Sequence, residues 1–141
     1  TRNKRRKMAL EMGRIVDSIL LVNPDARIVI LGDFNDQPGD YSLRKVFSHD
    51  FYNVFGQSDP NLGSTRFRRK WVSFDQILLS ETLLRGGYLN YLKGDVFRPP
   101  YLIENKGRHK GSPKRSFRGR FFQNGYSDHL PVYAVINVDH P

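Results

Sequence analysis

The spacing of apolar residues predicts a helix followed by a strand at the start of the chain. Apolar residues recur every three or four positions over residues 4–22, which is the period of an amphipathic helix. Asn23-Pro24-Asp25 ends this helix, because these residue types favour a turn. Residues 27–31 are then mostly β-branched and apolar, a pattern that predicts a strand buried on both faces. Together they indicate an α/β unit.

The same patterns predict shorter elements further along. Asp40 can cap a short helix over residues 41–47. Residues 48–63 are expected to be irregular, with a turn at Asp59-Pro60-Asn61. The later expectations are strands at 65–69 and 72–79 joined by a turn near Lys70-Trp71, one helical turn at 81–86, strands at 88–97 and 131–138, and a long loop at 104–125.

Composition narrows the class of protein. The chain has 141 residues, which fits one domain or part of one, and the 38% of hydrophobic residues are enough to build a core. The absence of cysteine excludes disulfides, thiolate zinc sites and cysteine nucleophiles. The apolar runs are too short for a membrane span. The sequence leaves the compartment and the oligomeric state open.

The formal net charge of +9 is concentrated in three segments, at residues 1–14, 66–70 and 104–120. Such clusters attract phosphate-rich partners, although a basic run is as often a solvated surface. The candidate substrate-binding residues lie in the last two segments. Arg66 and Arg68 alternate along a predicted strand and would share one face, and Arg115 and Arg118 lie in the long loop.

Polar residues directly follow the first predicted strand, at Gly32-Asp33-Phe34-Asn35. Ligands of open α/β sheets bind just beyond the carboxyl ends of strands, which is where these residues lie. The Asp33 carboxylate can hold a divalent cation or take a proton from water, and the Asn35 amide can donate to a phosphate oxygen. The alternative is a plain turn, because Asp, Asn, Pro and Gly all form turns.

Ser127-Asp128-His129 precedes the last predicted strand but is not expected to form a Ser-His-Asp triad. Adjacent residues of an extended chain point to opposite sides, so Asp128 and His129 should act in different directions. A functional His129 needs a carboxylate from elsewhere, and Asp75, inside an otherwise apolar strand, is the candidate partner. The alternatives are a structural or exposed histidine and an edge-strand Asp75 that faces water.

Three segments taken in order resemble the endonuclease/exonuclease/phosphatase superfamily, which contains the DNase I-like nucleases. They are residues 28–35 (IVILGDFN), 71–80 (WVSFDQILLS) and 125–132 (GYSDHLPV). Each motif is weak alone, whereas all three in this order and spacing are specific. The resemblance covers most of this chain but only the C-terminal half of the family domain.

The resemblance implies an α/β fold and a reaction. The fold would be part of a four-layer α/β sandwich, with two packed sheets flanked by helices, and residues 1–141 would form its C-terminal portion. The reaction would be Mg²⁺-dependent hydrolysis of a phosphoester by direct attack of water, with Mn²⁺ as the other candidate ion.

The family pattern also implies a role for each candidate. Asp33 would position and deprotonate the water, and Asn35 would hold the scissile phosphate and orient Asp33. His129 would stabilise charge on the phosphate, and Asp75 would hydrogen-bond His129 and keep it protonated. Asp128 would be a metal ligand or lie near a second metal, so Asp33 and Asp128 are the expected metal residues.

The family's N-terminal half normally supplies an Asn and a Glu that bind the principal Mg²⁺. Nothing in residues 1–141 replaces them. We therefore expect residues 1–141 alone to bind Mg²⁺ poorly and to turn over slowly.

Two classes of function remain open on the sequence. The first is a hydrolase acting on a phosphate-containing substrate, with nucleic acid as the leading candidate and inositol phosphates or lipid head groups close behind. The second is a non-catalytic nucleic-acid- or polyanion-binding module on the same scaffold. The second class gives Asp33, Asp75, Asp128 and His129 no joint purpose, whereas the first requires them to converge in the fold.

Overall fold

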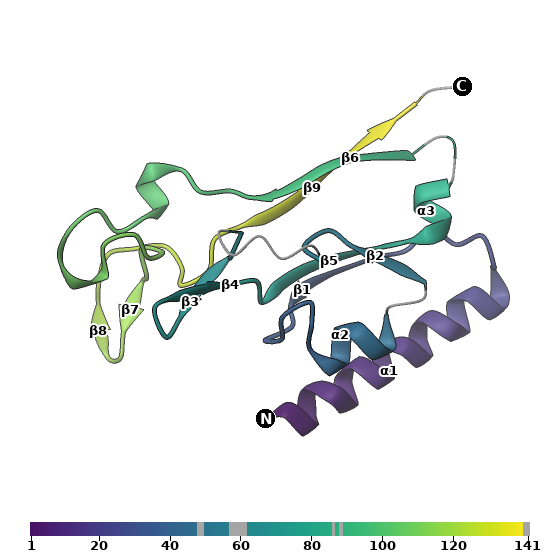
Figure 1. The fold of residues 1–141 in the computed structure, drawn as a ribbon, viewed down its shortest axis with the longest axis horizontal. Coiled ribbons are helices and arrows are strands. Elements are labelled where there is room, and N and C mark those ends of the chain that lie inside the picture. Colours follow the sequence, from purple (N-terminus) through teal and green to yellow (C-terminus); the bar gives the residue numbers. More distant parts are fainter. Residues whose placement is uncertain (48–49, 57–61, 86, 88, 140–141) are drawn as a thin grey trace.

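The computed structural model describes residues 1–47, 50–56, 62–85, 87 and 89–139. The fold is mixed α/β, with several small antiparallel sheets and few helices (Figure 1). The helical elements are α1 (Arg2–Val22), α2 (Tyr41–Val46), α3 (Glu81–Arg85), and the short 3-10 turns η1 (Pro100–Leu102) and η2 (Gly107–His109). The strands are β1 (Val29–Asp33), β2 (Phe51–Asn53), β3 (Thr65–Phe67), β4 (Lys70–Val72), β5 (Asp75–Ser80), β6 (Leu89–Val96), β7 (Phe117–Arg118), β8 (Phe121–Phe122) and β9 (Val132–Val138).

The centre of the fold is a three-stranded sheet in the order β1-β5-β2. Because side chains alternate along a strand, β5 contributes to a core on each face. Leu78 belongs to the core shared with α1 and α2, whereas Ile77 and Leu79 belong to the core shared with β6 and β9. Figure 1 shows the two helices below this sheet and the β6–β9 ribbon above it. The middle strand that carries Asp75 is therefore held from both sides.

β1 differs from the strand that the sequence predicted. It spans residues 29–33 rather than 27–31, and it is antiparallel to β5. The prediction of burial on both faces was wrong, because Ile30 is buried while Leu31 is 69% exposed. In the described part of the chain β1 is an edge strand, and α1 covers only the face that carries Ile30.

The segment between residues 65 and 79 also differs from its prediction. Three strands replace the two expected, because β3 ends at Phe67 and β4 begins at Lys70. The tight turn consists of Arg68 and Arg69, which adopt positive φ angles of 48° and 69°. A two-residue hairpin turn of this kind needs positive φ at both positions. The expectation that Arg66 and Arg68 share one strand face was therefore wrong, because Arg68 lies in the turn.

Several other predictions agree with the structure within a few residues. The first helix, the short helix after Asp40, the helical turn after Ser80 and the two long strands near the end correspond to α1, α2, α3, β6 and β9. β2 was not predicted. The predicted turn at residues 59–61, the end of the helical turn at 86 and the start of the strand at 88 lie outside the described residues. No helix in the described residues has the length and apolar character needed to cross a membrane.

The predicted long loop has internal structure and forms an arm, which we define as residues 100–126. Its base is a pair of extended segments, in which the amide of Lys114 donates to Leu102 (2.8 Å) and the amide of Glu104 donates to Ser112 (2.8 Å). η2 lies in the loop between these segments, and β7 pairs with β8 further along. Figure 1 shows the arm projecting away from the three-stranded sheet.

Candidate active site

Two carboxylates face each other at the end of the central sheet. In the register of β1 and β5, Asp33 is paired with Asp75, and the ladder continues with the amide of Phe34 donating to the carbonyl of Phe74 (2.9 Å). Asp33 is exposed, whereas the Asp75 side chain is only 17% exposed. Like charges directly opposite each other on neighbouring strands repel. This arrangement therefore calls for a positive group between them.

His129 reaches this position from the segment before β9. The amide of Leu130 donates to the carbonyl of Ser64 (2.7 Å), and the Thr65 hydroxyl donates to the carbonyl of Asp128 (2.7 Å). These bonds fix the backbone on both sides of His129 against β3. Its Nδ1 lies 2.7 Å from Oδ2 of Asp75, so the predicted contact between these residues is present.

Asn35 orients the carboxylate of Asp33. Its side-chain amide donates to Asp33 Oδ2 (3.0 Å) and its backbone amide donates to Oδ1 (2.8 Å), so both carboxylate oxygens are engaged by one residue. This close approach requires Asn35 to adopt a left-handed backbone with φ of 51°, a conformation that asparagine tolerates better than most residues. Asp33 and Asn35 thus form one hydrogen-bonded unit.

Asp33, Asp75 and His129 together could hold a metal ion. Each offers a ligand atom, and the three atoms lie within 4.8 Å of one another. Magnesium and manganese accept carboxylate oxygens, and manganese also accepts imidazole nitrogen. Two facing carboxylates are suited to a divalent cation because its charge relieves their repulsion. The same three residues also suit an imidazole that is held by Asp75 and lies beside the carboxylate of Asp33.

Asp128 lies outside this group. Its side chain is 56% exposed, and its carboxylate lies 3.8 Å from Nη1 of Arg115. Three of the four residues expected to converge therefore do so, while Asp128 points elsewhere, as adjacent residues of an extended segment must. Its expected role as a metal ligand stays a prediction.

A second polar network, which the sequence reasoning missed, supports the Asp33–Asn35 unit. Asp36 is 5% exposed and accepts from Nε of Arg5 (2.6 Å) and from the Ser42 hydroxyl (2.6 Å). The side-chain amide of the buried Gln76 donates to the backbone carbonyl of Asp36 (3.2 Å). The one signal of this network in the sequence was the acidic residue Asp36 directly after Asn35. Nothing in the sequence indicated that its partner is Arg5, which lies 31 positions before it.

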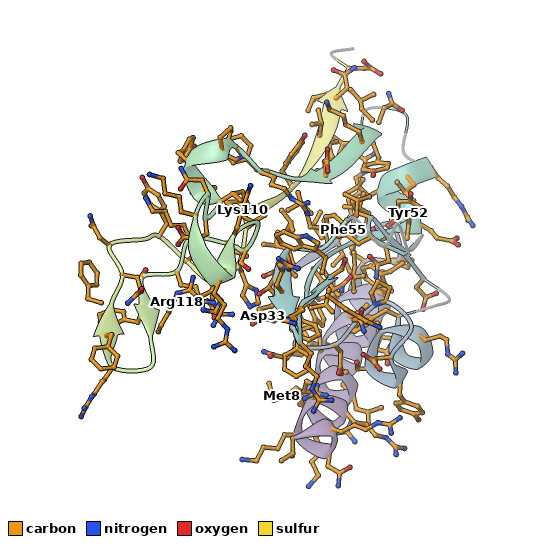
Figure 2. The ribbon with its side chains drawn as sticks, turned by 60° about the vertical axis from the view of Figure 1, so that its left-hand side comes forward. Met8, Asp33, Tyr52, Phe55, Lys110 and Arg118 are labelled. Carbon is orange, nitrogen blue, oxygen red and sulfur yellow. The ribbon has the colours of Figure 1, made fainter. Side chains whose placement is uncertain are left out.

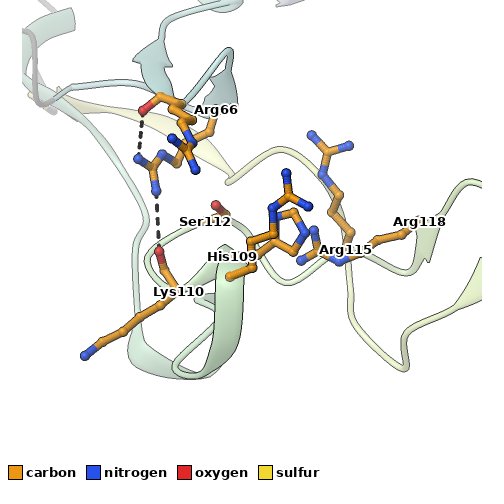
Figure 3. A pocket seen from close by; sticks show the side chains of 8 residues that line it. Arg66, His109, Lys110, Ser112, Arg115 and Arg118 are labelled. Atoms are coloured by element: carbon orange, nitrogen blue, oxygen red, sulfur yellow. Dashed lines mark hydrogen bonds between the residues drawn. The ribbon is translucent and has the colours of Figure 1, made fainter.

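Three of the four arginines predicted to bind substrate meet in one basic pocket. Arg66 from β3 lies with Arg115 and Arg118 from the arm in a pocket (Figure 3). Arg68 is not among the lining residues that the structure describes; its guanidinium lies over the ring of Phe67 (5.4 Å). The remaining described lining residues are Arg69, Arg108, His109, Lys110 and Ser112.

The basic pocket and the Asp33–Asp75–His129 group are joined through shared backbone. Arg66 follows Thr65, which bridges to His129, and Arg115 contacts Asp128, which precedes His129. Figure 2 places Asp33 on the sheet and Arg118 on the arm. The segments that position His129 therefore lie next to residues that line the basic pocket.

Comparison with known proteins gives one match. A family model described as the Endonuclease/Exonuclease/phosphatase family matches residues 1–138. No curated protein and no solved structure matches the chain. The match covers nearly the whole sequence and includes all three motifs on which the resemblance rested.

Proposed function

The chain belongs to the endonuclease/exonuclease/phosphatase family, and from that premise we propose that it hydrolyses a phosphoester with a divalent metal ion and an activated water. One observation carries the proposal. Asp33, Asp75 and His129 come from three distant segments, yet their ligand atoms lie within 4.8 Å of one another. A module that only binds polyanions needs positive charge and would gain nothing from two facing carboxylates.

His129 is the group that stabilises the phosphate in this proposal. Asp75 accepts from Nδ1–H, which fixes the ring and leaves Nε2 as the nitrogen that can donate to a phosphate oxygen. The carboxylate also holds the ring in one orientation, because the Nδ1 contact of 2.7 Å restricts its rotation. The side chain of His129 is 24% exposed, so a substrate can reach it.

Asp33 is the base that positions and deprotonates the attacking water. Asn35 holds its carboxylate in one orientation through two hydrogen bonds, so little reorganisation is needed when a substrate arrives. The family pattern also gives Asn35 a contact with the scissile phosphate. Most of the catalytic effect would then come from positioning and from fixed charges, as is usual for phosphoryl transfer.

The metal is assigned to the carboxylate pair. Asp33 and Asp75 supply oxygen ligands, which suit Mg²⁺, and Mn²⁺ is the alternative because it accepts the same ligands. When bound, such an ion would supply positive charge against the phosphate oxygens. Asp128 remains the proposed residue for a second metal position.

The family relationship also supports proposals about the wider fold. We propose that residues 1–141 form the C-terminal portion of a four-layer sandwich and that a further half completes the metal site. Comparing Mg²⁺ affinity and turnover of residues 1–141 with those of the full-length protein tests this. Equal values would refute it.

The substrate is a phosphate ester, with nucleic acid as the leading candidate. The test is hydrolysis of DNA, RNA, a phosphorylated inositol and bis(p-nitrophenyl) phosphate by the full-length protein with Mg²⁺ or Mn²⁺. Asp33→Asn should lower the rate by about 10²–10⁴-fold, as loss of a general base does. Asp25→Asn is the matched control, because Asp25 lies exposed in the turn after α1. Tight polyanion binding with no turnover in either metal would favour the non-catalytic module.

A further inference from the structure

The basic pocket concentrates positive charge at a site separate from the carboxylate pair. Seven of the eight lining residues that the structure describes are Arg, Lys or His, and the eighth is Ser112 (Figure 3). The pocket has a volume of about 480 Å³, which lies in the range of small-ligand sites. Like charges held this close repel one another, so an anion bound there would stabilise the arm.

The pocket is built by two separate segments rather than by one flexible run. Arg66 of β3 donates from Nη2 to the carbonyl of Arg69 (2.7 Å) and from Nη1 to the carbonyl of Lys110 (3.4 Å), and the second bond joins the hairpin to the arm. Arg69 holds a positive φ of 69°, which is unfavourable for a residue with a side chain. The arm is in turn fixed by the paired segments at its base.

The guanidinium of Arg66 also has unused hydrogen-bonding capacity. Its Nε is the buried side-chain atom that lacks a hydrogen-bond partner among the described residues. A buried donor without an acceptor is rare in folded proteins and often marks an ion or a water that completes the site. Both carbonyls that Arg66 meets are neutral, so its charge is not balanced by these contacts.

Two acidic residues near the pocket balance its charge only weakly. Glu104 lies 3.7 Å from Arg118, and Asp128 lies 3.8 Å from Arg115, so both ion pairs are long. Partly exposed pairs at such distances contribute little energy. Phosphate oxygens at hydrogen-bonding distance would compete with them, because charge-assisted bonds to arginine are short and often bidentate.

The pKa of His109 is sensitive to the positive charges of the pocket. Its pKa is lowered from the ordinary value, first by desolvation and then by the charges of Arg118, Arg108 and Arg115, with Glu104 acting in the opposite direction. An anion among these arginines would cancel their effect and raise the pKa of His109. The imidazole is therefore a built-in probe of anion binding.

We propose that the basic pocket is a second phosphate subsite, which binds a non-scissile phosphomonoester of the substrate while the scissile phosphate lies at His129. This inference rests on the proposed function for its catalytic meaning. A phosphomonoester carries nearly two negative charges near neutral pH and three strong acceptor oxygens, so it suits a pocket of arginines better than a diester does. The substrate class is thus a phosphoester that bears at least one further phosphate.

The lining favours phosphate over a base or an acyl chain. No Phe, Tyr or Trp side chain is among the described lining residues, although stacking on such rings is the usual way to hold an unpaired base. No large aliphatic side chain lines it either, within the same described set. Arg and Lys donors with one serine hydroxyl are the groups that meet phosphate oxygens.

The binding test uses inorganic pyrophosphate as the probe, in EDTA so that no metal site contributes. Titration calorimetry should show that the wild type binds pyrophosphate. The affinity of the double variant Arg108→Gln/Arg118→Gln should be at least tenfold lower, because each substitution removes a charged donor. Arg44→Gln/Lys93→Gln, with two exposed basic residues changed outside the pocket, is the matched control and should bind as wild type. No wild-type binding, or equal loss in both double variants, would overturn the subsite.

A variant that binds pyrophosphate more tightly than the wild type is a useful second test, because a misfolded variant would lose affinity rather than gain it. Glu104→Gln removes a competing carboxylate, so pyrophosphate should bind several-fold more tightly. The NMR pKa of His109 should rise when pyrophosphate is added to the wild type. Unchanged or weaker binding by Glu104→Gln, or a His109 pKa that does not respond, would contradict the placement of the anion.

Hydrolysis then separates this inference from the proposed function. His129→Ala should abolish hydrolysis and leave pyrophosphate binding intact. For the full-length protein, a dinucleotide with a 5′-phosphate is compared with the same dinucleotide without it, and an inositol bisphosphate with its monophosphate. The pair in which the extra phosphate raises kcat/KM identifies the substrate as a nucleotide or an inositol phosphate. In that pair, Arg108→Gln/Arg118→Gln should remove the difference in kcat/KM. Hydrolysis with equal kcat/KM within both pairs would refute the subsite alone.

Discussion

The link between α1 and the site loop should be measurable as stability. Arg5 lies on the first turns of α1, and its Nε donates to Oδ1 of Asp36 at 2.6 Å. The Asp36 side chain is 7% exposed and that of Arg5 is 34% exposed. Among the described residues, Arg5→Ala leaves the buried carboxylate with one side-chain donor, the hydroxyl of Ser42.

The size of this effect follows from burial. Removing one partner of a fully buried ion pair costs about 3–5 kcal/mol. Because Arg5 is one-third exposed, water can replace part of what it gives, and we expect a loss of about 2 kcal/mol in the free energy of unfolding. With a urea m-value near 2 kcal/mol/M for a small domain, the unfolding midpoint should fall by about 1 M.

The control lies on the same helix. Arg14 pairs with Glu11 at 3.0 Å, but their side chains are 78% and 58% exposed. Arg14→Ala should therefore change the unfolding free energy by less than about 0.5 kcal/mol. Urea unfolding followed by circular dichroism measures both variants. Equal midpoint shifts for Arg5→Ala and Arg14→Ala would refute the argument that the buried carboxylate of Asp36 sets the cost.

Three further predictions concern catalysis, the arm and pH. Asp75→Asn should lower kcat by about 10²–10³-fold with KM little changed, because His129 loses the carboxylate that orients its ring; steady-state kinetics would contradict this if KM alone rose. Gly125→Ala places a methyl group on two backbone carbonyl oxygens of the arm and should cost more than about 2 kcal/mol, whereas Gly39→Ala meets open space and should be nearly neutral in urea unfolding. The pKa of His109 is lowered in the folded protein, so the unfolded chain binds more protons between the folded and ordinary values. Stability should therefore fall on acidification through that window, and the midpoint of His109→Gln should show a smaller fall; an identical pH dependence would count against it.

The regular elements were predictable where one local pattern dominates. Residues 2–22 form a helix because their apolar positions have helical spacing, and residues 132–138 form a strand because their composition allows little else. The exposure of Leu31 was not predictable, because it depends on which strands and helices cover β1. Burial is set by the assembly of elements, whereas periodicity is set by the chain itself.

The site divides in the same way. Asp33, Asp75 and His129 were found from three motifs, and the contact between the last two is present in the structure. The Arg5–Asp36 pair was missed, because a single long-range ion pair leaves no periodic trace in the sequence. The basic pocket was predicted only in part. Its charge was visible in the sequence, but its arrangement depends on hydrogen bonds that pair residues 102–104 of the arm with residues 112–114.

The central claim is that the Asp33–Asp75–His129 group hydrolyses phosphoesters. The most direct measurement is the Mg²⁺-dependent hydrolysis of bis(p-nitrophenyl) phosphate by the full-length protein and by His129→Ala, with Asp25→Asn as the control. The account predicts turnover by the wild type and by the control, and loss of nearly all turnover in His129→Ala. Hydrolysis by His129→Ala at the wild-type rate would contradict it.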